Sequence, residues 1–483
     1  MASTTHADDT LHVAIAGAGI AGLAAAVALT RNFGSRVDVQ LYDKATALRE
    51  IGASIALGPN GLRTLEKLGV ENALDDDVAF RGPSGLPMIY RHWKTNEIVS
   101  YDEFVNVPER RHQTARFARA HLHQSLLEHV DPARIHLGKK IVSVKEEAGN
   151  EGPLVLKFAD GSETKADFVV GADGINSGVR KFFVPEQKLG WTTQVAYRAV
   201  FDASLVEGTP DLPEDSTHWW GPTGSFFASR LGKGQFTTVG IISLDPSDPK
   251  NAAIVDNARW DNLADINFVR ELYKASNTIT NQKEPQTLTA AGNQDWHPLI
   301  RTLFARTPAS SIRVYPNLAI TAPLPAHTFL GGRAVLIGDA AHPHGGAFAT
   351  GGSLALDDAY ALAQALRAVW PGPSSGTAAT AAAGGGGKPA KDRLAQATRI
   401  YEKARKPHTT RLLTVVHALT EKSKERLRRS DGGVETDEEL RKRMKARAET
   451  SWLHEHDVDE AVRRAVEAEL GAVGGAGSVE ARL

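Results

Sequence analysis

The sequence predicts an α/β protein that consists of a Rossmann-type dinucleotide-binding domain, an inserted mixed β-sheet domain and C-terminal helices. A strand, a glycine-rich turn and an alanine-rich helix follow one another in residues 11–29. Aromatic-rich segments of alternating polarity take over between about residues 186 and 314, and they suit an antiparallel sheet. Charged, helix-favouring residues fill 394–470. In this order, the three patterns indicate an interrupted α/β domain closed by helices.

The dinucleotide-binding domain is predicted from short apolar strands that run into glycine or aspartate turns. In chain order these strands are Leu11–Ala16, Val37–Tyr42, Leu154–Phe158, Ala166–Val170 and Ala334–Ile337. The first two flank the alanine-rich helix and complete a βαβ unit. Asp160-Gly161 indicates a hairpin turn after the third strand, and residues 353–369 have helical spacing after the last one.

The expected domain boundaries follow these changes in pattern. In chain order, the dinucleotide-binding domain takes 11–78, the second domain 79–114, the first domain again 115–185, the β-sheet part of the second domain 186–314 and the first domain once more 315–370. Residues 371–391 are rich in Gly, Ala, Ser and Pro, so we predict a disordered surface insertion there. Residues 392–470 are predicted to be the C-terminal helical segment.

The composition favours a small molecule as the partner of this chain. Its 483 residues carry 56 Lys plus Arg against 57 Asp plus Glu, so neither nucleic acid nor an anionic membrane is favoured. The absence of cysteine excludes disulfides, thiolate metal sites and a cysteine nucleophile. His121, His123 and His129 lack the spacing of helical metal ligands, so we predict no metal site.

We expect the protein to be cytoplasmic. No apolar run approaches the roughly 20 residues that a membrane-spanning helix needs, and Met1–Asp9 lacks the apolar core of a signal peptide. The terminal Ala481-Arg482-Leu483 resembles a peroxisomal import signal, which makes a peroxisomal location the alternative. The sequence leaves a monomer and a homodimer both open.

The first glycine turn carries the chemistry of dinucleotide binding. Gly17 permits the tight turn, Gly19 lets backbone approach a pyrophosphate, and Gly22 lets the helix pack close to the strand. The N-terminus of that helix then directs free N–H groups at the phosphate charge. Asp43 ends the second strand, where a carboxylate accepts hydrogen bonds from an adenosine ribose. Together, these residues predict a bound dinucleotide.

Two later motifs each place an aspartate directly after a strand. They are Gly171-Ala-Asp173-Gly174 and Gly338-Asp339-Ala-Ala-His342-Pro343. With the first glycine turn, the set resembles the FAD-dependent aromatic-ring monooxygenases, the class A flavoprotein monooxygenases, and in particular their salicylate-hydroxylase-like group. The resemblance implies that FAD is bound noncovalently. It also implies that the segment around Asp339 meets the ribityl chain and pyrophosphate, while the segment around Asp173 supports FAD and the pyridine nucleotide.

Two more segments extend the resemblance, and a weaker likeness covers residues 452–458. Arg119 and Gln124 match an arginine and a glutamine on a helix that faces the flavin pyrophosphate, although His121 replaces the usual aspartate. Residues 50–60 resemble the loop that lies along the flavin. The predicted cofactor-binding residues are Gly17, Gly19, Gly22, Asp43, Gly52, Ala53, Ser54, Arg119, Gln124, Asp173, Gly174, Gly338, Asp339, Pro343, Gly351 and Gly352.

The resemblance also implies the reaction. In this family NADH or NADPH reduces FAD, O2 adds at C4a of the flavin, and the hydroperoxide transfers one oxygen to an electron-rich ring. We therefore expect a hydroxylase of a phenolic or salicylate-like small molecule. The nicotinamide is expected to bind transiently, because the chain contains a single GxGxxG.

Four residues are the predicted catalytic set: Arg198, Tyr197, Pro343 and His344. Arg198 matches a family position on the substrate side of the flavin, where a fixed cation favours a deprotonated ring substituent. A structural ion pair is the alternative for Arg198, and loop packing is the alternative for His344. The loop from Pro343 to Gly352 is expected to border the flavin ring, because its backbone N–H groups stabilise charge on a reduced flavin.

The sequence also departs from the family. The loop 343–352 lacks a second proline and the Gly-Gln-Gly cluster, and Ser225–Arg230 replaces a histidine and a Tyr-Pro pair of the relatives. A substrate other than salicylate is therefore expected. Trp219-Trp220 either lines the pocket or packs the second sheet. A flavin dehydrogenase or oxidase, an epoxidase and a nonenzymatic flavin-binding protein are the alternatives, whereas a halogenase is disfavoured because Trp-x-Trp-x-Ile-Pro is absent.

Overall fold

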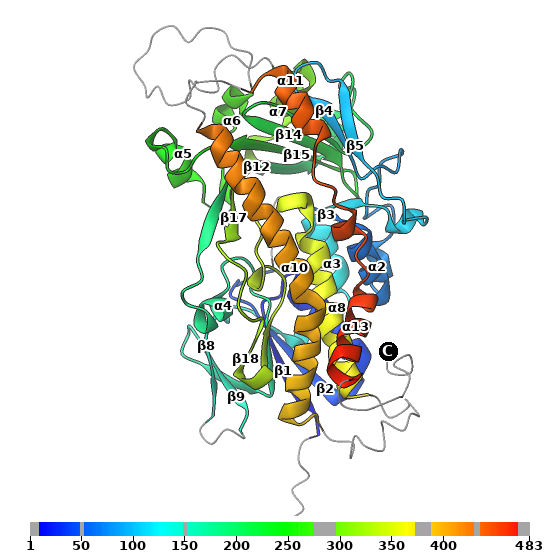
Figure 1. Cartoon of the computed structure of the whole chain (residues 1–483), viewed down its shortest axis with the longest axis vertical. Coiled ribbons are helices and arrows are strands. Elements are labelled where there is room, and N and C mark those ends of the chain that lie inside the picture. Colours follow the sequence, from blue (N-terminus) through cyan, green and yellow to red (C-terminus); the bar gives the residue numbers. More distant parts are fainter. Residues whose placement is uncertain are drawn as a thin grey trace, which may run out of the picture.

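The computed structural model describes residues 9–48, 53–147, 152–259, 261–273, 296–371, 388–428 and 435–471. Two sheet-based layers are stacked along the long axis, and the helix α10 (Lys391–Leu427) runs beside both of them (Figure 1). This arrangement confirms the predicted α/β class with two sheet-based parts and C-terminal helices. The boundaries between domains stay a prediction.

A six-stranded sheet forms the lower layer in the order β18-β19-β11-β1-β2-β7. Its strands are β1 (Leu11–Ala16), β2 (Val37–Tyr42), β7 (Ile135–His136), β11 (Phe168–Gly171), β18 (Thr328–Phe329) and β19 (Ala334–Leu336). All neighbouring pairs are parallel except β18–β19 at the edge. Parallel sheets are buried on both faces, which explains why these strands read as nearly continuous apolar runs.

Helices cover one face of this sheet and a small sheet covers the other. Val13 and Ile15 of β1 join the core with the helices, while Ala14 and Ala16 join the core on the opposite face. This split follows from the two-residue alternation of a strand. The helices of the lower layer are α1 (Ile20–Phe33), α2 (Pro59–Lys67), α3 (Arg119–Leu127), α4 (Gly178–Phe183) and α8 (Gly351–Val369). The small sheet consists of β8 (Ile141–Glu146), β9 (Leu154–Phe158) and β10 (Glu163–Ala166).

An eight-stranded sheet forms the upper layer in the order β16-β17-β12-β15-β14-β13-β4-β5. In chain order, its strands are β4 (Met88–His92), β5 (Ile98–Asp102), β12 (Leu189–Asp202), β13 (Thr217–Trp220), β14 (Gly224–Arg230), β15 (Gln235–Ser243), β16 (Asn262–Leu263) and β17 (Arg313–Ile320). The helices of this layer are α5 (Ala252–Asn257), α6 (Ile266–Leu272) and α7 (Pro298–Arg306). A two-stranded ribbon of β3 (Ser54–Leu57) and β6 (Ala115–Ala118) belongs to neither large sheet.

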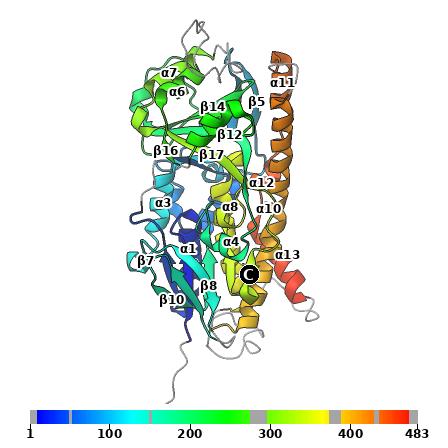
Figure 2. The ribbon, with the colours of Figure 1, turned by 90° about the vertical axis from the view of Figure 1, so that its left-hand side faces the viewer.

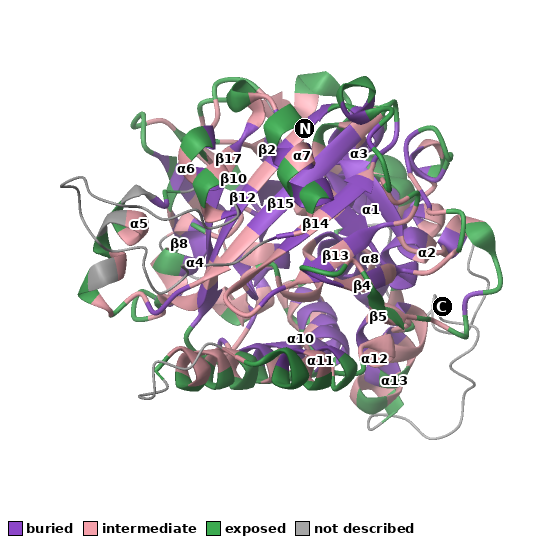
Figure 3. Ribbon diagram, turned by 90° about the horizontal axis from the view of Figure 1, so that it is seen from above, coloured by how far each residue is buried: buried purple, intermediate pink, exposed green. Residues whose placement is uncertain are grey.

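The C-terminal helices line one side of both layers (Figure 2). They are α10, α11 (Asp437–Lys445), α12 (Ser451–His454) and α13 (Val458–Leu470). The Thr436 side chain and Glu439 cap α11 reciprocally, which satisfies its first N–H groups. Because these helices lie on the outside, they are less buried than α1 and α8, and Figure 3 shows that the outer surface of α11 is exposed.

The strand boundaries expected from the sequence agree closely with the structure. The first three predicted strands coincide with β1, β2 and β9, and the next two start or end within two residues of β11 and β19. Most of the predicted insertion, residues 372–387, and the terminal 481–483 lie outside the described residues. Among the described residues, no helix is long and apolar enough to cross a membrane.

Trp219 offers a test of the upper core. It is a fully buried side chain between the eight-stranded sheet and its helices, so Trp219→Ala leaves a large cavity. We expect the free energy of unfolding to fall by about 3–5 kcal/mol, measured by urea unfolding followed by circular dichroism. Leu263→Ala in the same sheet is the control, because Leu263 is 58% exposed and its loss costs at most about 0.5 kcal/mol. Equal losses for both variants would contradict the assignment.

Candidate active site

Three loops meet at the carboxyl edge of the six-stranded sheet. They follow β1, β11 and β19, which are adjacent parallel strands, so their ends lie side by side. Arg180 joins two of these loops. Its Nη1 donates to the carbonyl oxygens of Asp339 and Ala340 at 3.0 Å, and its Nη2 donates to the carbonyl of Ile175. The second and third motifs of the sequence therefore form one connected edge.

The glycine turn has the backbone geometry that dinucleotide binding requires. Gly17 has a φ of +101°, and a Cβ there would lie 2.6 Å from the carbonyl oxygen of Ala172. A Cβ at Gly22 would lie 1.9 Å from the carbonyl oxygen of Gly17. Gly19 is open in contrast, since the nearest atom to a Cβ there is Nη2 of Arg119 at 4.0 Å. The structure thus brings Arg119 to the N-terminus of α1, where an anion is favoured.

His123 holds this turn in place, a role that the sequence analysis did not find. Its Nε2 lies 2.8 Å from the carbonyl oxygen of Ala18, and the ring is buried. His123 follows Arg119 by four residues on α3, so both side chains share one helix face. That spacing was a usable signal. Gln124 lies on another face, exposed, and donates to Glu128 at 3.4 Å.

Asp43 lies at the end of β2, as predicted, and binds the backbone of the turn. Its Oδ2 accepts from the N–H of Ala18 at 2.8 Å, and its Oδ1 accepts from the N–H of Ala45 at 2.7 Å. Each carboxylate oxygen has a second lone pair. Asp43 can therefore shape the turn and still accept a hydrogen bond from a ribose hydroxyl.

Asp173 uses one of its two carboxylate oxygens for hydrogen bonds to described residues. Its Oδ2 accepts from the N–H groups of Gly178 at 2.6 Å and Val179 at 3.2 Å, at the start of α4. Its Oδ1 is enclosed and has no hydrogen-bond partner among the described residues. Gly174 beside it has a φ of +77° and no atom within 4 Å of a Cβ position. An enclosed acceptor next to open space is suited to a ligand's donor.

Asp358 is the buried hub of the third loop. It accepts hydrogen bonds from the N–H of Gly338 at 2.8 Å, from Nε of Arg405 at 2.8 Å, and pairs with Nε2 of His342 at 2.6 Å. Burial opposes its ionisation, but His342 and Arg405 outweigh burial and hold the pKa of Asp358 well below its usual range. The side chain of Asp339, in contrast, makes no hydrogen bond to any described residue and is only half-buried.

The loop between β19 and α8 is held in an unusual backbone conformation. Gly345 and Gly346 have φ values of +70° and +69°, and Phe348 also has a positive φ of +57°. His344 is 2% exposed, and its Nδ1 and Nε2 lie 3.2 Å from the His342 carbonyl and 3.4 Å from Thr350 Oγ1. Burial lowers the pKa of His344, so the ring is neutral near pH 7. Local strain of this kind is concentrated at functional sites.

The loop is anchored at both ends. The carbonyl of Pro343 accepts from the N–H of Ile320 at 3.0 Å, which ties the loop to the end of β17. At the other end α8 begins at Gly351, and a Cβ on Gly352 would lie 2.7 Å from Leu57. The free N–H groups of this helix N-terminus favour negative charge in front of them. Ala53 accepts from the N–H of Arg119 at 2.9 Å, whereas Gly52 lies outside the described residues.

Arg198 faces this loop from the eight-stranded sheet. A Cβ on Gly346 would lie 3.4 Å from its Nη2, and the guanidinium lies 5.5 Å from the ring centroid of Tyr315. Its Nε is enclosed without a hydrogen-bond partner, and no ion pair of Arg198 forms with any described residue. Burial lowers the pKa of Arg198, yet a guanidinium stays charged. The structural ion pair considered for Arg198 is therefore not observed.

Tyr197 lies on the other face of the same strand. It is 5% exposed and packs in the core between the sheet and its helices, with its ring centroid 6.1 Å from that of Phe268. Strand alternation thus separates its hydroxyl from Arg198. This position contradicts the catalytic role predicted for Tyr197.

The tryptophan pair is divided in the same way. Trp219 packs in the core, while Trp220 faces the side of Arg198 and donates through Nε1 to Nδ1 of His218 at 3.2 Å. His218 pairs across the sheet with Phe227, in the segment that lacks the relatives' histidine. A neighbouring strand therefore supplies an imidazole that the sequence analysis considered missing.

Comparison with known proteins gives the family. The chain belongs to the FAD binding domain family, whose model matches residues 10–224 and 253–381. The salicylate hydroxylase of Pseudomonas putida is 28% identical over 475 residues, which cover 94% of each chain. The 6-hydroxynicotinate 3-monooxygenase of Pseudomonas fluorescens is 27% identical over 360 residues, 74% of this chain and 83% of that one. The structure titled salicylate hydroxylase substrate complex has a TM-score of 0.65, 23% identity and coverage of 95% and 98%.

These relatives confirm the resemblance: the chain is an FAD-dependent monooxygenase, and FAD is its cofactor. The described residues fit that cofactor. Gly19 leaves open space at a helix N-terminus beside Arg119, and the carboxylates of Asp173 and Asp339 keep oxygens that no described residue uses. Which of these atoms contacts FAD remains a prediction.

Asp339 is expected to hold the cofactor rather than the fold. Because its carboxylate makes no hydrogen bond to any described residue, Asp339→Ala removes an acceptor without breaking a protein hydrogen bond. A hydrogen bond to a charged group contributes roughly 1.5–3 kcal/mol, so we expect FAD to bind about 10- to 100-fold more weakly. The flavin content and the flavin dissociation constant are the measurements, and the exposed Asp392→Ala is the control. A normal flavin affinity would sink this assignment.

Asp358→Asn tests the buried hub. The change removes the closer of two buried acids that pair with Arg405, since Asp357 remains at 3.9 Å, and breaking a buried ion pair costs about 3–5 kcal/mol. We expect lower thermal stability and poor flavin retention together, since the N–H of Gly338 and the ring of His342 lose the same partner. Thermal unfolding of the holoprotein and its absorbance near the flavin maximum report both effects. A thermal stability and a flavin content equal to those of the wild type would contradict this role of Asp358.

Proposed function

We propose that this chain hydroxylates a small phenolic or salicylate-like aromatic compound with NADH or NADPH and O2. One observation carries the proposal: Arg198 forms no ion pair with any described residue, and it lies on the sheet face that borders the loop 343–352. A fixed cation there attracts a deprotonated ring hydroxyl. The relatives named above act on salicylate and 6-hydroxynicotinate, which are hydroxylated ring acids.

The cofactor would be bound along the carboxyl edge of the six-stranded sheet. The N-terminus of α1 with Arg119 would hold the pyrophosphate, Asp43 the ribose, and Asp339 the ribityl chain. Asp173 and Gly174 would support FAD and the visiting nicotinamide. Bound FAD, once reduced, supplies the oxygen-transfer chemistry.

The protein's own part is to orient the substrate and to exclude water. Arg198 lowers the pKa of a substrate hydroxyl close to it, which raises the electron density of the ring. Pro343 and His344 fix the loop that faces the substrate, and the N-terminus of α8 stabilises negative charge that develops before it. The apolar side chains of Val239 and Ile241 on the facing sheet exclude water.

Arg198→Ala tests this function. We expect FAD to stay bound, because Arg198 makes no hydrogen bond or ion pair with the described residues that are predicted to hold FAD, while substrate-stimulated NAD(P)H oxidation falls about 10- to 100-fold. A panel of aromatic compounds is screened for faster NAD(P)H oxidation, and product masses are read for one added oxygen. Tyr197→Phe is the matched control on the opposite face of β12 and is expected to leave the rate unchanged.

Two outcomes would count against the proposal. Unchanged kinetics of Arg198→Ala with an anionic substrate would remove the role of this arginine. NAD(P)H oxidation that is stimulated by a compound but adds no oxygen to it would favour a dehydrogenase or oxidase.

A further inference from the structure

A second arginine, Arg116, is buried at the interface that Arg198 faces. Arg116 lies on β6 opposite Ala56 of β3, and Ser54 lies opposite Ala118, so the side chains of Arg116 and Ser54 share one face of this ribbon. The hydroxyl of Ser54 lies 3.0 Å from that of Thr237 on β15. The face that carries Arg116 is therefore pressed against the eight-stranded sheet.

Two of the three guanidinium nitrogens of Arg116 donate hydrogen bonds to described residues. Its Nε donates to Ser216 Oγ at 3.1 Å, its Nη2 donates to the carbonyl of Pro87 at 2.8 Å, and the group lies 5.3 Å from the ring centroid of Phe227. Nη1 makes no hydrogen bond with any described residue. Arg116 is only 7% exposed, yet its Nη1 is not enclosed by the protein. The small accessible surface of Arg116 thus includes an unused donor.

No described acid neutralises this charge. Burial lowers the pKa of Arg116 to about 10, so the guanidinium stays charged at neutral pH. Asp102 is the acid that acts on it, but Asp102 accepts from the hydroxyl of Tyr90 at 2.9 Å and is paired with Arg447. A buried charge without a partner is strongly unfavourable. An anion that binds at Nη1 would relieve that cost.

The histidines nearby are neutral and do not compete as cations. Burial and then Arg116 lower the pKa of His218 to about 3. Because Trp220 Nε1 donates to its Nδ1, the proton of the neutral ring is on Nε2, which donates to Ser225 Oγ at 2.9 Å. Burial likewise lowers the pKa of His454 to about 4. Arg116 is therefore positioned as the cation that an incoming anion would meet on this side.

The register of the sheet relates Arg116 to Arg198. Arg198 of β12 lies opposite Val239 of β15, and Val239 lies opposite Phe227 of β14, the residue beneath Arg116. Neighbouring strands lie about 4.8 Å apart, so this row covers roughly 10 Å between Arg198 and Phe227. A substituted benzene ring with a polar group at each end matches that span. Val239 and Phe227 supply an apolar surface for the ring between the two cations.

We propose that Arg116 binds the carboxylate of the substrate and thereby selects hydroxylated aromatic carboxylic acids over neutral phenols. This inference rests on the proposed function, in which Arg198 holds the ring oxygen. Arg116 contacts the group distant from that oxygen and determines specificity rather than reactivity. The carboxylate accepts from Nη1, the nitrogen of the Arg116 guanidinium that donates to no described residue.

Equilibrium binding to the purified holoprotein tests the subsite without turnover. The probes are 3- and 4-hydroxybenzoate with the corresponding hydroxybenzamides, and the signal is the change in flavin absorbance on titration. We expect at least one acid to bind the wild-type protein about tenfold or more tightly than its amide. Arg116→Met should weaken that acid roughly 10- to 100-fold and leave the amide within about threefold. Arg116→Lys should recover part of the preference, because the charge remains while the planar guanidinium and its several donors are lost.

Arg91→Met is the matched control. Arg91 is a half-buried arginine on β4 whose register with Trp219 places it toward the opposite face of the sheet, so the acid preference should persist. Flavin content and circular dichroism must match the wild type in each variant. Equal binding of acids and amides by the wild type, or an acid preference that survives Arg116→Met, would overturn the subsite.

Turnover of the same panel distinguishes this subsite from the reaction itself. Acid-selective binding that depends on Arg116, with no product containing an added oxygen, would support the subsite and contradict the proposed function. Hydroxylation of acids and amides at equal kcat/KM would do the reverse.

Discussion

The cofactor edge depends on one buried carboxylate, Asp358. It binds three groups from different parts of the chain, namely the backbone of Gly338, the ring of His342 and the guanidinium of Arg405 on α10. An unpaired charge at this depth would be costly, so each partner is needed to keep the others in place. The network fixes the backbone of the third loop, and the neighbouring Asp339 carboxylate makes no hydrogen bond to any described residue. Asp358 thus stabilises the loop, while the predicted cofactor contact falls to the next residue after Gly338, Asp339.

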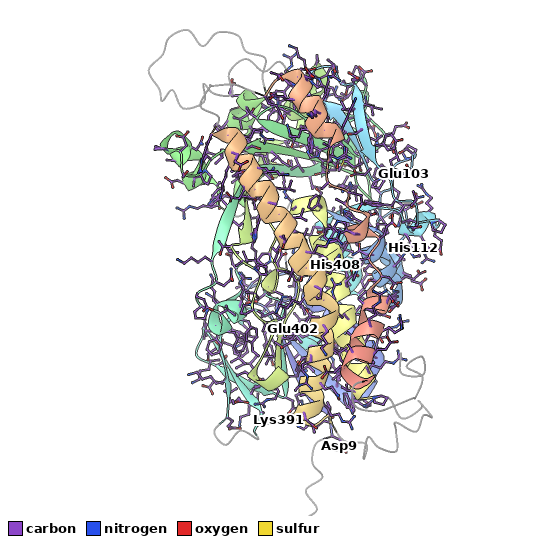
Figure 4. The ribbon with its side chains drawn as sticks, in the orientation of Figure 1. Asp9, Glu103, His112, Lys391, Glu402 and His408 are labelled. Atoms are coloured by element: carbon purple, nitrogen blue, oxygen red, sulfur yellow. The ribbon has the colours of Figure 1, made fainter. Side chains whose placement is uncertain are left out.

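Arg405 also explains why the C-terminal helices matter to a site formed mainly by the first 370 residues. The helix α10 carries Arg405 and His408 on its buried side, and Figure 4 marks His408 midway along it. His408 stacks on His456 at 3.9 Å between ring centroids, and Trp452 packs edge-on against it at 5.6 Å. Burial lowers the pKa of both histidines, His456 to about 3, so the stack joins neutral rings. The segment 452–458, which carried the weak family likeness, lies between α11 and α13 and is thereby packed against α10.

The parallel sheet was predictable because its physics is local. A strand buried on both faces must be apolar along its length, and a turn that approaches a phosphate must be glycine, so β1, β2 and the three loops can be read from their own residues. The contacts of these loops were not predictable in the same way. Asp358, Arg405 and Arg180 act across separations of 16 to 159 residues along the chain. Only the fold brings them together, and nothing in their local sequence marks them.

The substrate side shows the limit more sharply, because it depends on which face of a strand a residue occupies. Tyr197 and Arg198 are adjacent in the sequence, β12 contributes residues to apolar clusters on both of its faces, and alternation alone cannot say which face meets the lower layer. That is why the prediction placed Tyr197 beside Arg198, although the two side chains lie on opposite faces of β12. Arg116 was not predicted as a site residue for a different reason, which is its place in the fold. It comes from the β3–β6 ribbon, and it reaches the row of Arg198, Val239 and Phe227 only when the two layers pack together. A substrate site between two layers is thus specified by their docking, which no single segment of the sequence encodes.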